Sequence, residues 1–372
     1  MLILTGLVLL VSAFLASTIL SCAVRAVATR LNFVDAPGAR KVHARPIPLG
    51  GGIAFFVTLT AIVGGGALFA LWQADVGPAS WLPELLQRHL PGLAKRAPLA
   101  FFVLAGGAVM FLLGLIDDLR GLSPWSRILV QALVAVALCA ASDKLRITAF
   151  VDVRWISYVY TTFWIVGITN AFNLLDNMDG LSAGVAVVAS GVFLVLAVLT
   201  GQYFLAATLL VFIGALLGFL LFNFPPATLF MGDAGSTFIG YMLGVLTVLF
   251  TFYMPELGHN PVSSIVTPLV ILAVPIYDTA SVVIIRLHAR KPVFEGDKNH
   301  FSHRLVALGM TPRAAVITIY LVTLCTGLLA PLLLRLSMGM ATLVFLNAAL
   351  MLVLIWLLEH TGRRGQNQRN GQ

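Results

Sequence analysis

Long apolar stretches separated by short polar blocks recur along almost the whole chain. A membrane-spanning helix needs about 20 mostly apolar residues, and the pattern predicts about eleven such helices. They are expected at residues 2–24, 49–72, 99–116, 127–142, 155–171, 181–199, 203–222, 236–253, 264–285, 315–334 and 338–358. Because a backbone in lipid must satisfy its own hydrogen bonds, the sequence indicates an all-α polytopic membrane protein.

The composition agrees with this class. The chain has 372 residues, of which 59% are hydrophobic and 10% charged, and a mean hydropathy of +0.98, which excludes an ordinary soluble globule. Residues 1–362 are expected to form one transmembrane domain. Residues 363–372, rich in Arg, Gly, Asn and Gln, are expected to form a disordered cytoplasmic tail.

The basic residues predict an orientation. Most of the 23 Lys and Arg residues fall in segments that share one side of the membrane if the amino terminus is periplasmic. The positive-inside rule therefore predicts a periplasmic amino terminus and a cytoplasmic carboxyl terminus. The net charge of +8 is then mainly a topology signal and partly a means of holding anionic substrates. Nucleic acid is not expected as a partner.

The acidic residues indicate chemistry. There are only 15 Asp and Glu residues, yet several lie at the ends of apolar stretches. A charge in hydrocarbon costs roughly 2.5–3.5 kcal/mol on insertion scales, so clustered carboxylates need a shared cation or polar cavity. The predicted topology places three blocks on the cytoplasmic side, namely Asp117-Asp118, Asn170-xx-Asn173-xx-Asp176-xx-Asp179 and Asp233.

The first two blocks suit a divalent metal. Asn170 and Asn173 share a helix face if the helix predicted over 155–171 continues, and Gly180 is a natural break before the next helix. Amide and carboxylate oxygens are the hard ligands that Mg²⁺ prefers. The alternatives are an ordinary Asn/Asp/Gly loop for the second block and a solvated helix end with an Asp–Arg pair for Asp117-Asp118.

Phosphate-binding candidates surround these acids. Asp233 precedes a predicted helix, whose amino end could bind phosphate, although a plain turn is the alternative. Arg290, His300 and His303 lie in a loop that could hold phosphate or sugar oxygens or act only as an inside-retention signal. Lys41 belongs to a further basic loop.

Two other features have structural or functional interpretations. The glycines at 50–52 do not form a P-loop and are expected to permit close helix packing. Asp278, inside a predicted helix, is either functional or paired with a structural partner.

Rival classes explain the pattern less well. A transporter or channel would place charges near the bilayer midplane and often shows an internal repeat, whereas these acids are expected at one face. A non-catalytic lipid-binding scaffold gives no reason for so many oxygen ligands on one side. A membrane enzyme with a divalent-metal site is favoured.

The blocks, in this order, resemble the polyprenyl-phosphate N-acetylhexosamine-1-phosphate transferase superfamily. The motifs that carry the resemblance are Asp117-Asp118, Asn170-xx-Asn173-xx-Asp176-xx-Asp179-Gly180 and Phe230-Met231-Gly232-Asp233. The family includes the initiators of O-antigen and enterobacterial common antigen, together with phospho-MurNAc-pentapeptide transferase. Here Gly121 and Ser302 stand where the family often has a further acid or lysine and a histidine. The absence of a longer His-rich block favours the O-antigen-type initiators.

The resemblance implies an enzyme of the bacterial inner membrane with its active site on the cytoplasmic face. It would transfer N-acetylhexosamine-1-phosphate from a UDP-sugar to undecaprenyl phosphate, release UMP, and initiate lipid-linked O-antigen or another cell-envelope glycan. Mg²⁺ would be the cofactor, with Mn²⁺ as a substitute. Membrane lipids and a second copy of the chain, in a homodimer, are further partners to be tested.

The resemblance also assigns roles to matching residues. Asp117, Asp118 and Asp176 would be catalytic, and Asn173 and Asp233 would contact the metal. The substrate-binding residues would be Asn170, Asp179, Lys41, Arg290, His300 and His303.

Overall fold

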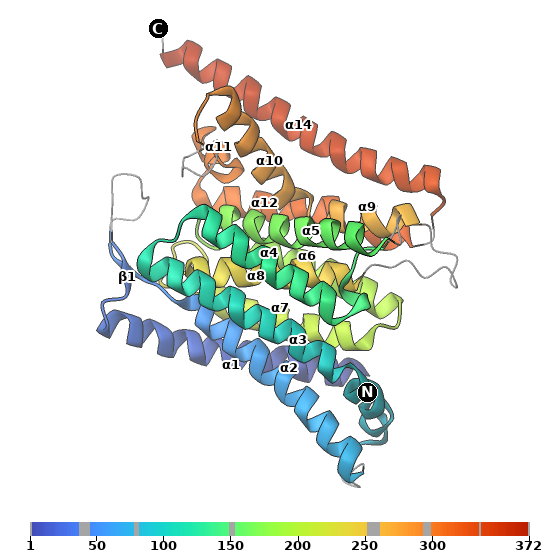
Figure 1. Cartoon of the computed structure of the whole chain (residues 1–372). Helices are drawn as coiled ribbons and strands as arrows, with labels where there is room; N and C mark the ends of the chain where they lie inside the picture. The colour runs from blue at the N-terminus through green and yellow to red at the C-terminus, as the bar shows by residue number, and fades with distance from the viewer. Residues whose placement is uncertain are drawn as a thin grey trace.

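Helices account for nearly all of the regular structure that the computed structural model describes (Figure 1). The described residues are 2–36, 45–77, 82–148, 153–250, 261–292, 299–334 and 336–370. Strands β1 (Val34–Asp35) and β2 (Ile47–Pro48) form one antiparallel pair.

The described helices follow one another along the chain. They are α1 (Leu2–Arg30), α2 (Gly51–Val76), α3 (Glu84–Arg120), α4 (Pro124–Ala141), α5 (Arg154–Leu175), α6 (Leu181–Leu199), α7 (Tyr203–Asn223), α8 (Gly232–Leu249), α9 (Pro261–Ile271), α10 (Ala273–His288), α11 (Phe301–Ala307), α12 (Pro312–Gly327), α13 (Ala330–Leu333) and α14 (Met338–Asn370). A 3₁₀ turn, η1, spans Asp143–Leu145.

The prediction of an all-α polytopic membrane protein is confirmed. Within the described residues, nine helices are long and apolar enough to cross a membrane. Two other predicted spans correspond to α5, whose end is polar, and to the pair α9 and α10. The span predicted over 264–285 is interrupted at Leu272, and prolines at 268 and 275 explain the interruption because each removes a backbone donor.

Helix ends differ more from the prediction than helix positions do. α3 begins at Glu84 rather than at residue 99, and its first turns carry charged residues that an apolar pattern does not detect. α14 continues to Asn370, through most of the segment predicted to be a disordered tail. Extending an existing helix requires no new nucleation, and residues 363–370 continue α14 in the structure.

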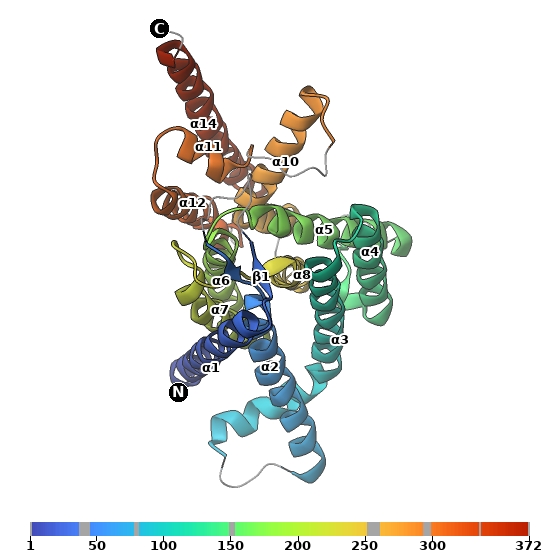
Figure 2. The same ribbon diagram turned by 90° about the vertical axis from the view of Figure 1, so that its left-hand side faces the viewer.

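α8 is the centre of the bundle. In its spanning window 89% of residues are buried, and α2, α3, α5 and α6 all contact it. Figure 2 shows α8 enclosed by its neighbours, with α10 and α14 extending away from them. The first turn of α8 carries Asp233, so the most enclosed helix positions one of the candidate site residues.

Glycines allow α2 to approach α8 closely, as predicted for the glycines before this helix. A Cβ at Gly52 would lie 2.6 Å from the Cα and the nitrogen of Gly235 in α8. The Gly52 N–H also donates to the Met231 carbonyl at 3.0 Å. A side chain at Gly52 would therefore separate α2 from the helix that carries Asp233.

We expect Gly52→Ala to destabilise the protein by about 1–3 kcal/mol, because the added methyl group overpacks a backbone contact. The matched control is Gly65→Ala in the same helix, where a Cβ meets nothing within 4 Å. Alanine is the better helix former, so the control should keep or raise the unfolding temperature in detergent. Equal shifts for the two variants would contradict this packing.

One end of the bundle collects the polar blocks. α1, α3, α5 and α7 end there, and α2, α4, α6, α8 and α12 begin there. In Figure 1, α1 starts at the opposite end, whereas α14 runs back toward the polar end. The two termini therefore lie at opposite ends of the bundle, and which end is cytoplasmic stays a prediction.

Candidate active site

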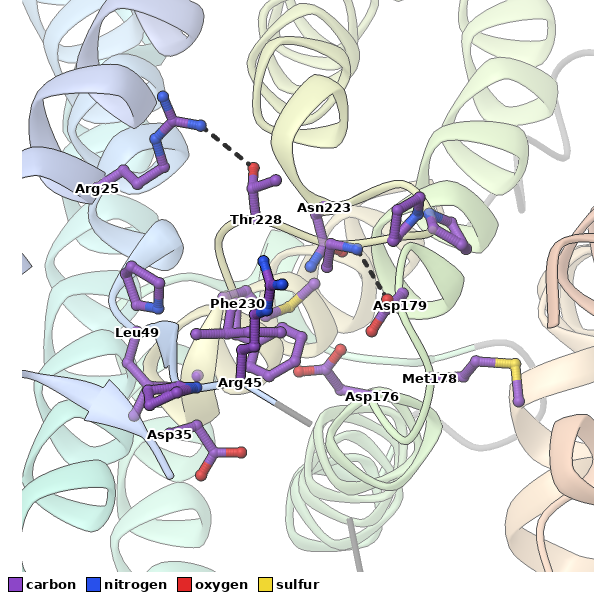
Figure 3. A pocket seen from close by; sticks show the side chains of 18 of the residues that line it. Arg25, Asp35, Arg45, Leu49, Asp176, Met178, Asp179, Asn223, Thr228 and Phe230 are labelled. Carbon is purple, nitrogen blue, oxygen red and sulfur yellow. Dashed lines mark hydrogen bonds between the residues drawn. The ribbon is translucent and has the colours of Figure 1, made fainter. Parts of the chain in front are cut away.

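An open pocket of about 1760 Å³ lies at the polar end of the bundle. Its walls come from the end of α1, β2, the end of α3, the loops that precede α6 and α8, α11 and the start of α12. Five of the predicted acids line it together, namely Asp117, Asp118, Asp176, Asp179 and Asp233. Figure 3 shows Asp176 and Asp179 facing the cavity near Asn223. The structure thus brings together three blocks that are far apart in sequence.

Asp118 fixes the start of α8. Its Oδ1 accepts a hydrogen bond from the Asp233 N–H at 2.7 Å, and its Oδ2 accepts from the Ala234 N–H at 3.1 Å. A carboxylate at a helix amino end also suits the helix dipole. Gly232 has φ +74°, and a Cβ there would lie 2.5 Å from Asp118 Oδ2. Asp118 therefore holds Asp233 in place through the backbone.

Asp117 is paired with Arg127. Its Oδ1 accepts from the Leu122 N–H at 2.6 Å, and its Oδ2 contacts the Arg127 guanidinium. Arg127 Nη1 also lies 4.0 Å from Asp233 Oδ2. An Asp–Arg pair is present, but Asp117 is only 8% exposed, so the helix end is not simply solvated.

Asn173 joins α5 to α8. Its Nδ2 donates to Asp233 Oδ1 at 2.7 Å and to Ser236 Oγ at 3.0 Å. The two residues that the resemblance assigned to the metal are therefore in direct contact.

Asp176 and Asp179 follow the end of α5. Asp179 Oδ2 accepts from the Ala227 N–H at 2.8 Å. Burial, and then the charges of Asp233, Asp118 and Asp179, raise the pKa of Asp176 well above its ordinary value. A group of carboxylates in this state would be stabilised by a bound cation.

Hydrogen bonds from residues outside the acid motifs connect the loop before α6 with the loop before α8. Asn223 accepts from the Gly180 N–H and donates to the Leu229 carbonyl, both at 3.0 Å. Arg313 Nε donates to the Pro225 carbonyl at 2.8 Å. Gly180 has φ +73° and directly precedes α6, as its predicted role as a helix break requires.

The two predicted histidines, His300 and His303, have different environments. His303 lines the pocket. His300 is 4% exposed, and its Nδ1 lies 2.9 Å from Asp278 Oδ2. Of the two alternatives for Asp278, the structure therefore shows the structural partner.

Two other predicted substrate-binding residues, Asn170 and Arg290, are not brought into the pocket. Asn170 Nδ2 donates to Gln131 Oε1 at 2.6 Å, and Arg290 is exposed just beyond α10. Neither is among the described residues that line the pocket. Lys41 lies outside the described residues.

The basic side of the pocket was not recognised from sequence as part of the site. Its arginines had been assigned to the topology signal and to the overall positive charge, not to individual site roles. They are Arg25, Arg30, Arg45 and Arg313. Arg25 Nη1 donates to Thr228 Oγ1 at 3.4 Å (Figure 3). Its guanidinium carbon lies 5.2 Å from the centroid of the Phe222 ring. The pocket therefore has acidic and basic walls, which suits a cation together with anionic reactants.

The donor set fits a hydrated Mg²⁺ ion. Mg²⁺ usually keeps several waters and takes one or two carboxylates plus substrate phosphates. Within the described residues, no group of three or more His, Cys, Asp or Glu side chains surrounds a single position, and Mg²⁺ stays a prediction. Asp117 and Asp233 supply carboxylate oxygens on either side of Arg127, and Asn173 contacts Asp233 through its amide nitrogen.

Comparisons with known proteins show which family the chain belongs to. Residues 100–251, which include the three acidic blocks, match the family described as Glycosyl transferase family 4. A probable undecaprenyl-phosphate N-acetylglucosaminyl 1-phosphate transferase of Bacillus subtilis (strain 168) is 33% identical over 305 residues, covering 80% of this chain and 76% of that protein. An undecaprenyl-phosphate alpha-N-acetylglucosaminyl 1-phosphate transferase of Yersinia pestis is 30% identical over 332 residues, covering 86% and 81%. A decaprenyl-phosphate N-acetylglucosaminephosphotransferase of Mycobacterium tuberculosis (strain ATCC 25618 / H37Rv) is 32% identical over 321 residues, covering 80% and 75%. The chain belongs to the polyprenyl-phosphate N-acetylhexosamine-1-phosphate transferase superfamily.

Proposed function

We propose that this protein transfers N-acetylglucosamine-1-phosphate from UDP-N-acetylglucosamine to undecaprenyl phosphate. The observation that carries the proposal is the convergence of the three acidic blocks on one pocket that also has arginines in its wall. The names of the relatives support the sugar and the polyprenyl phosphate. The product would be the first lipid-linked intermediate of O-antigen or another cell-envelope glycan.

The proposed reaction exchanges one phosphoanhydride for another. An oxygen of the lipid phosphate bonds to the β-phosphorus of the sugar nucleotide. The bond between that phosphorus and the bridging oxygen breaks, and UMP leaves with the bridging oxygen. A phosphate monoester has a second pKa of about 6, so the attacking phosphate is mostly dianionic at neutral pH. No strong general base is required.

Charge compensation is then the main task of the pocket. Arg127 lies between Asp117 and Asp233 and is placed to approach a phosphate beside them. Asp117 orients that guanidinium, and Asn173 orients Asp233. Bound Mg²⁺ would supply further positive charge to the diphosphate, held by Asp117, Asp233 and Asn173. Asp176 and Asp179 are proposed to complete the polar wall for the metal and the nucleotide.

The proposed location is the inner membrane, with the pocket on the cytoplasmic face, because UDP-sugars are cytoplasmic metabolites. Two exposed positions at opposite ends of α4 test this orientation. After replacement of Cys22, Cys139 and Cys325, Ser123→Cys should be shielded from an impermeant thiol reagent in intact cells, and Lys144→Cys should be labelled. The reverse labelling pattern would place the pocket outside.

The sugar is tested with a panel of UDP-sugars. Purified protein in detergent would receive undecaprenyl phosphate, Mg²⁺ and one labelled UDP-sugar at a time, and the lipid product would be separated. UDP-N-acetylglucosamine should give the highest kcat/KM. Preference for UDP-N-acetylgalactosamine or a deoxy-aminosugar would change the proposed sugar and leave the reaction class in place.

A further inference from the structure

The short helix α11 connects α10 to α12 and carries His303 into the pocket. Two contacts fix its start. The Phe301 N–H donates to Asp278 Oδ1 at 2.6 Å, so a carboxylate from α10 caps the helix. The Ser302 hydroxyl donates to the side-chain oxygen of Asn177, which belongs to the acidic block after α5. The position of α11 is therefore linked directly to the acidic wall of the pocket.

A third contact comes from the last helix of the chain. Arg304 Nε lies 2.9 Å from Glu359 Oε2, and the two residues are 3% and 4% exposed. Arg304 Nη1 also donates to the Asn299 carbonyl at 2.6 Å and to Ser281 Oγ at 3.0 Å. Tyr277 lies beneath the guanidinium, 5.8 Å from it to the ring centroid. Arg304 therefore contributes its charge to this cluster and does not line the pocket.

Glu359 links α11 to a helix that is otherwise peripheral. In the spanning window of α14 only 11% of residues are buried, and its main helix contacts are with α9 and α13. A buried ion pair seldom stabilises a protein more than apolar side chains of similar size would, because both charges lose water. In some proteins such a pair instead confers conformational specificity, and here the pair joins α14 to α11.

We propose that Glu359 is a positioning residue for the transfer reaction. Through Arg304 it fixes α11, and α11 holds His303 at the pocket and Ser302 against Asn177. Glu359 touches no reacting group, and its effect on substrate is transmitted by His303. This inference rests on the proposed function and on the substrate-binding role that the resemblance assigns to His303, which lines the pocket.

The test is a double-mutant cycle between Glu359→Gln and His303→Ala, with kcat and KM measured for both substrates. Each single variant should raise the KM for the UDP-sugar by about tenfold, equivalent to one moderate hydrogen bond. The KM for lipid phosphate should change less than about twofold. The double variant should be no worse than His303→Ala, because coupled residues are not additive. Glu359→Asp, which keeps the charge, should recover part of the loss.

Hydrogen exchange provides a readout that does not depend on activity. In Glu359→Gln the amides of residues 301–307 should exchange faster, while those of α6 and α8 stay protected. Glu84→Gln is the control, since the Glu84 side chain is 90% exposed. The inference would be overturned if the KM increases of the two single variants multiplied in the double variant. It would also be overturned if Glu359→Gln lowered the unfolding temperature but left KM and the exchange of α11 unchanged. If wild-type protein transfers no sugar phosphate, the proposed function fails, and unchanged exchange in α11 would independently reject the coupling.

Discussion

Asp233→Asn should lower kcat/KM by about a hundredfold or more and leave the protein folded. The substitution removes one negative charge from the proposed Mg²⁺ site, and losing one preorganised electrostatic group typically costs a factor of about 10² to 10³. The shape is kept, because asparagine can still accept the hydrogen bond that Asn173 donates to Asp233 Oδ1 at 2.7 Å. Activity should fall most at limiting Mg²⁺.

The unfolding temperature distinguishes a loss of metal binding in Asp233→Asn from misfolding. Asp233 lies among other carboxylates, so its neutralisation should keep or raise the unfolding temperature measured without Mg²⁺. Asp75→Asn, an exposed acid near the other end of α2, should change neither activity nor stability. Full turnover by Asp233→Asn at limiting Mg²⁺ would remove Asp233 from the metal site.

Asp118→Asn should abolish most activity by a different route. Both oxygens of Asp118 accept backbone hydrogen bonds at the start of α8, and asparagine offers only one acceptor. Its amide N–H would face a backbone N–H, which costs about 1–3 kcal/mol when buried. We expect a lower unfolding temperature and a displaced Asp233, with kcat reduced more than in variants that only lose a charge.

Asp179→Asn is the matched control for stability. Only one of its oxygens accepts a backbone hydrogen bond, from Ala227 at 2.8 Å, and an asparagine oxygen can replace it. The unfolding temperatures of both variants would be compared by thermal melts in the same detergent. A wild-type unfolding temperature for Asp118→Asn would show that its cap is dispensable.

Sequence periodicity predicted the fold because lipid leaves few alternatives for the backbone. Each apolar stretch had to be a helix, and the polar blocks had to lie at helix ends. Helix extensions beyond the bilayer were not predictable in this way, since the charged start of α3 and the polar end of α14 resemble connecting segments. The two prolines near Leu272 explain the break between α9 and α10, but apolar periodicity alone does not reveal it.

The acidic side of the pocket was predictable for a similar reason. Carboxylates beside hydrocarbon require an explanation, and that requirement singled out Asp117, Asp118, Asp176, Asp179 and Asp233. Arginines near a membrane surface are common and carry no such signal.

Pairing between distant residues was not predictable. Arg127 and Arg313 were counted only as basic residues near the membrane, although the structure places them against Asp117 and Pro225. The partner of Arg304 was missed because Glu359 is 55 residues away in sequence, and nothing in its local pattern marks it. The partner of Asn170 was not predictable either, since its side-chain amide donates to Gln131 in the neighbouring helix α4.

The central claim is that a sugar phosphate, and not a sugar alone, moves to the lipid. The direct test uses UDP-N-acetylglucosamine labelled with ³²P in the β-phosphate, together with undecaprenyl phosphate, Mg²⁺ and the purified protein. The account predicts that the label enters the lipid product while unlabelled UMP is released in equal amount. Release of labelled UDP together with an unlabelled glycolipid would contradict it, as would the absence of any lipid product.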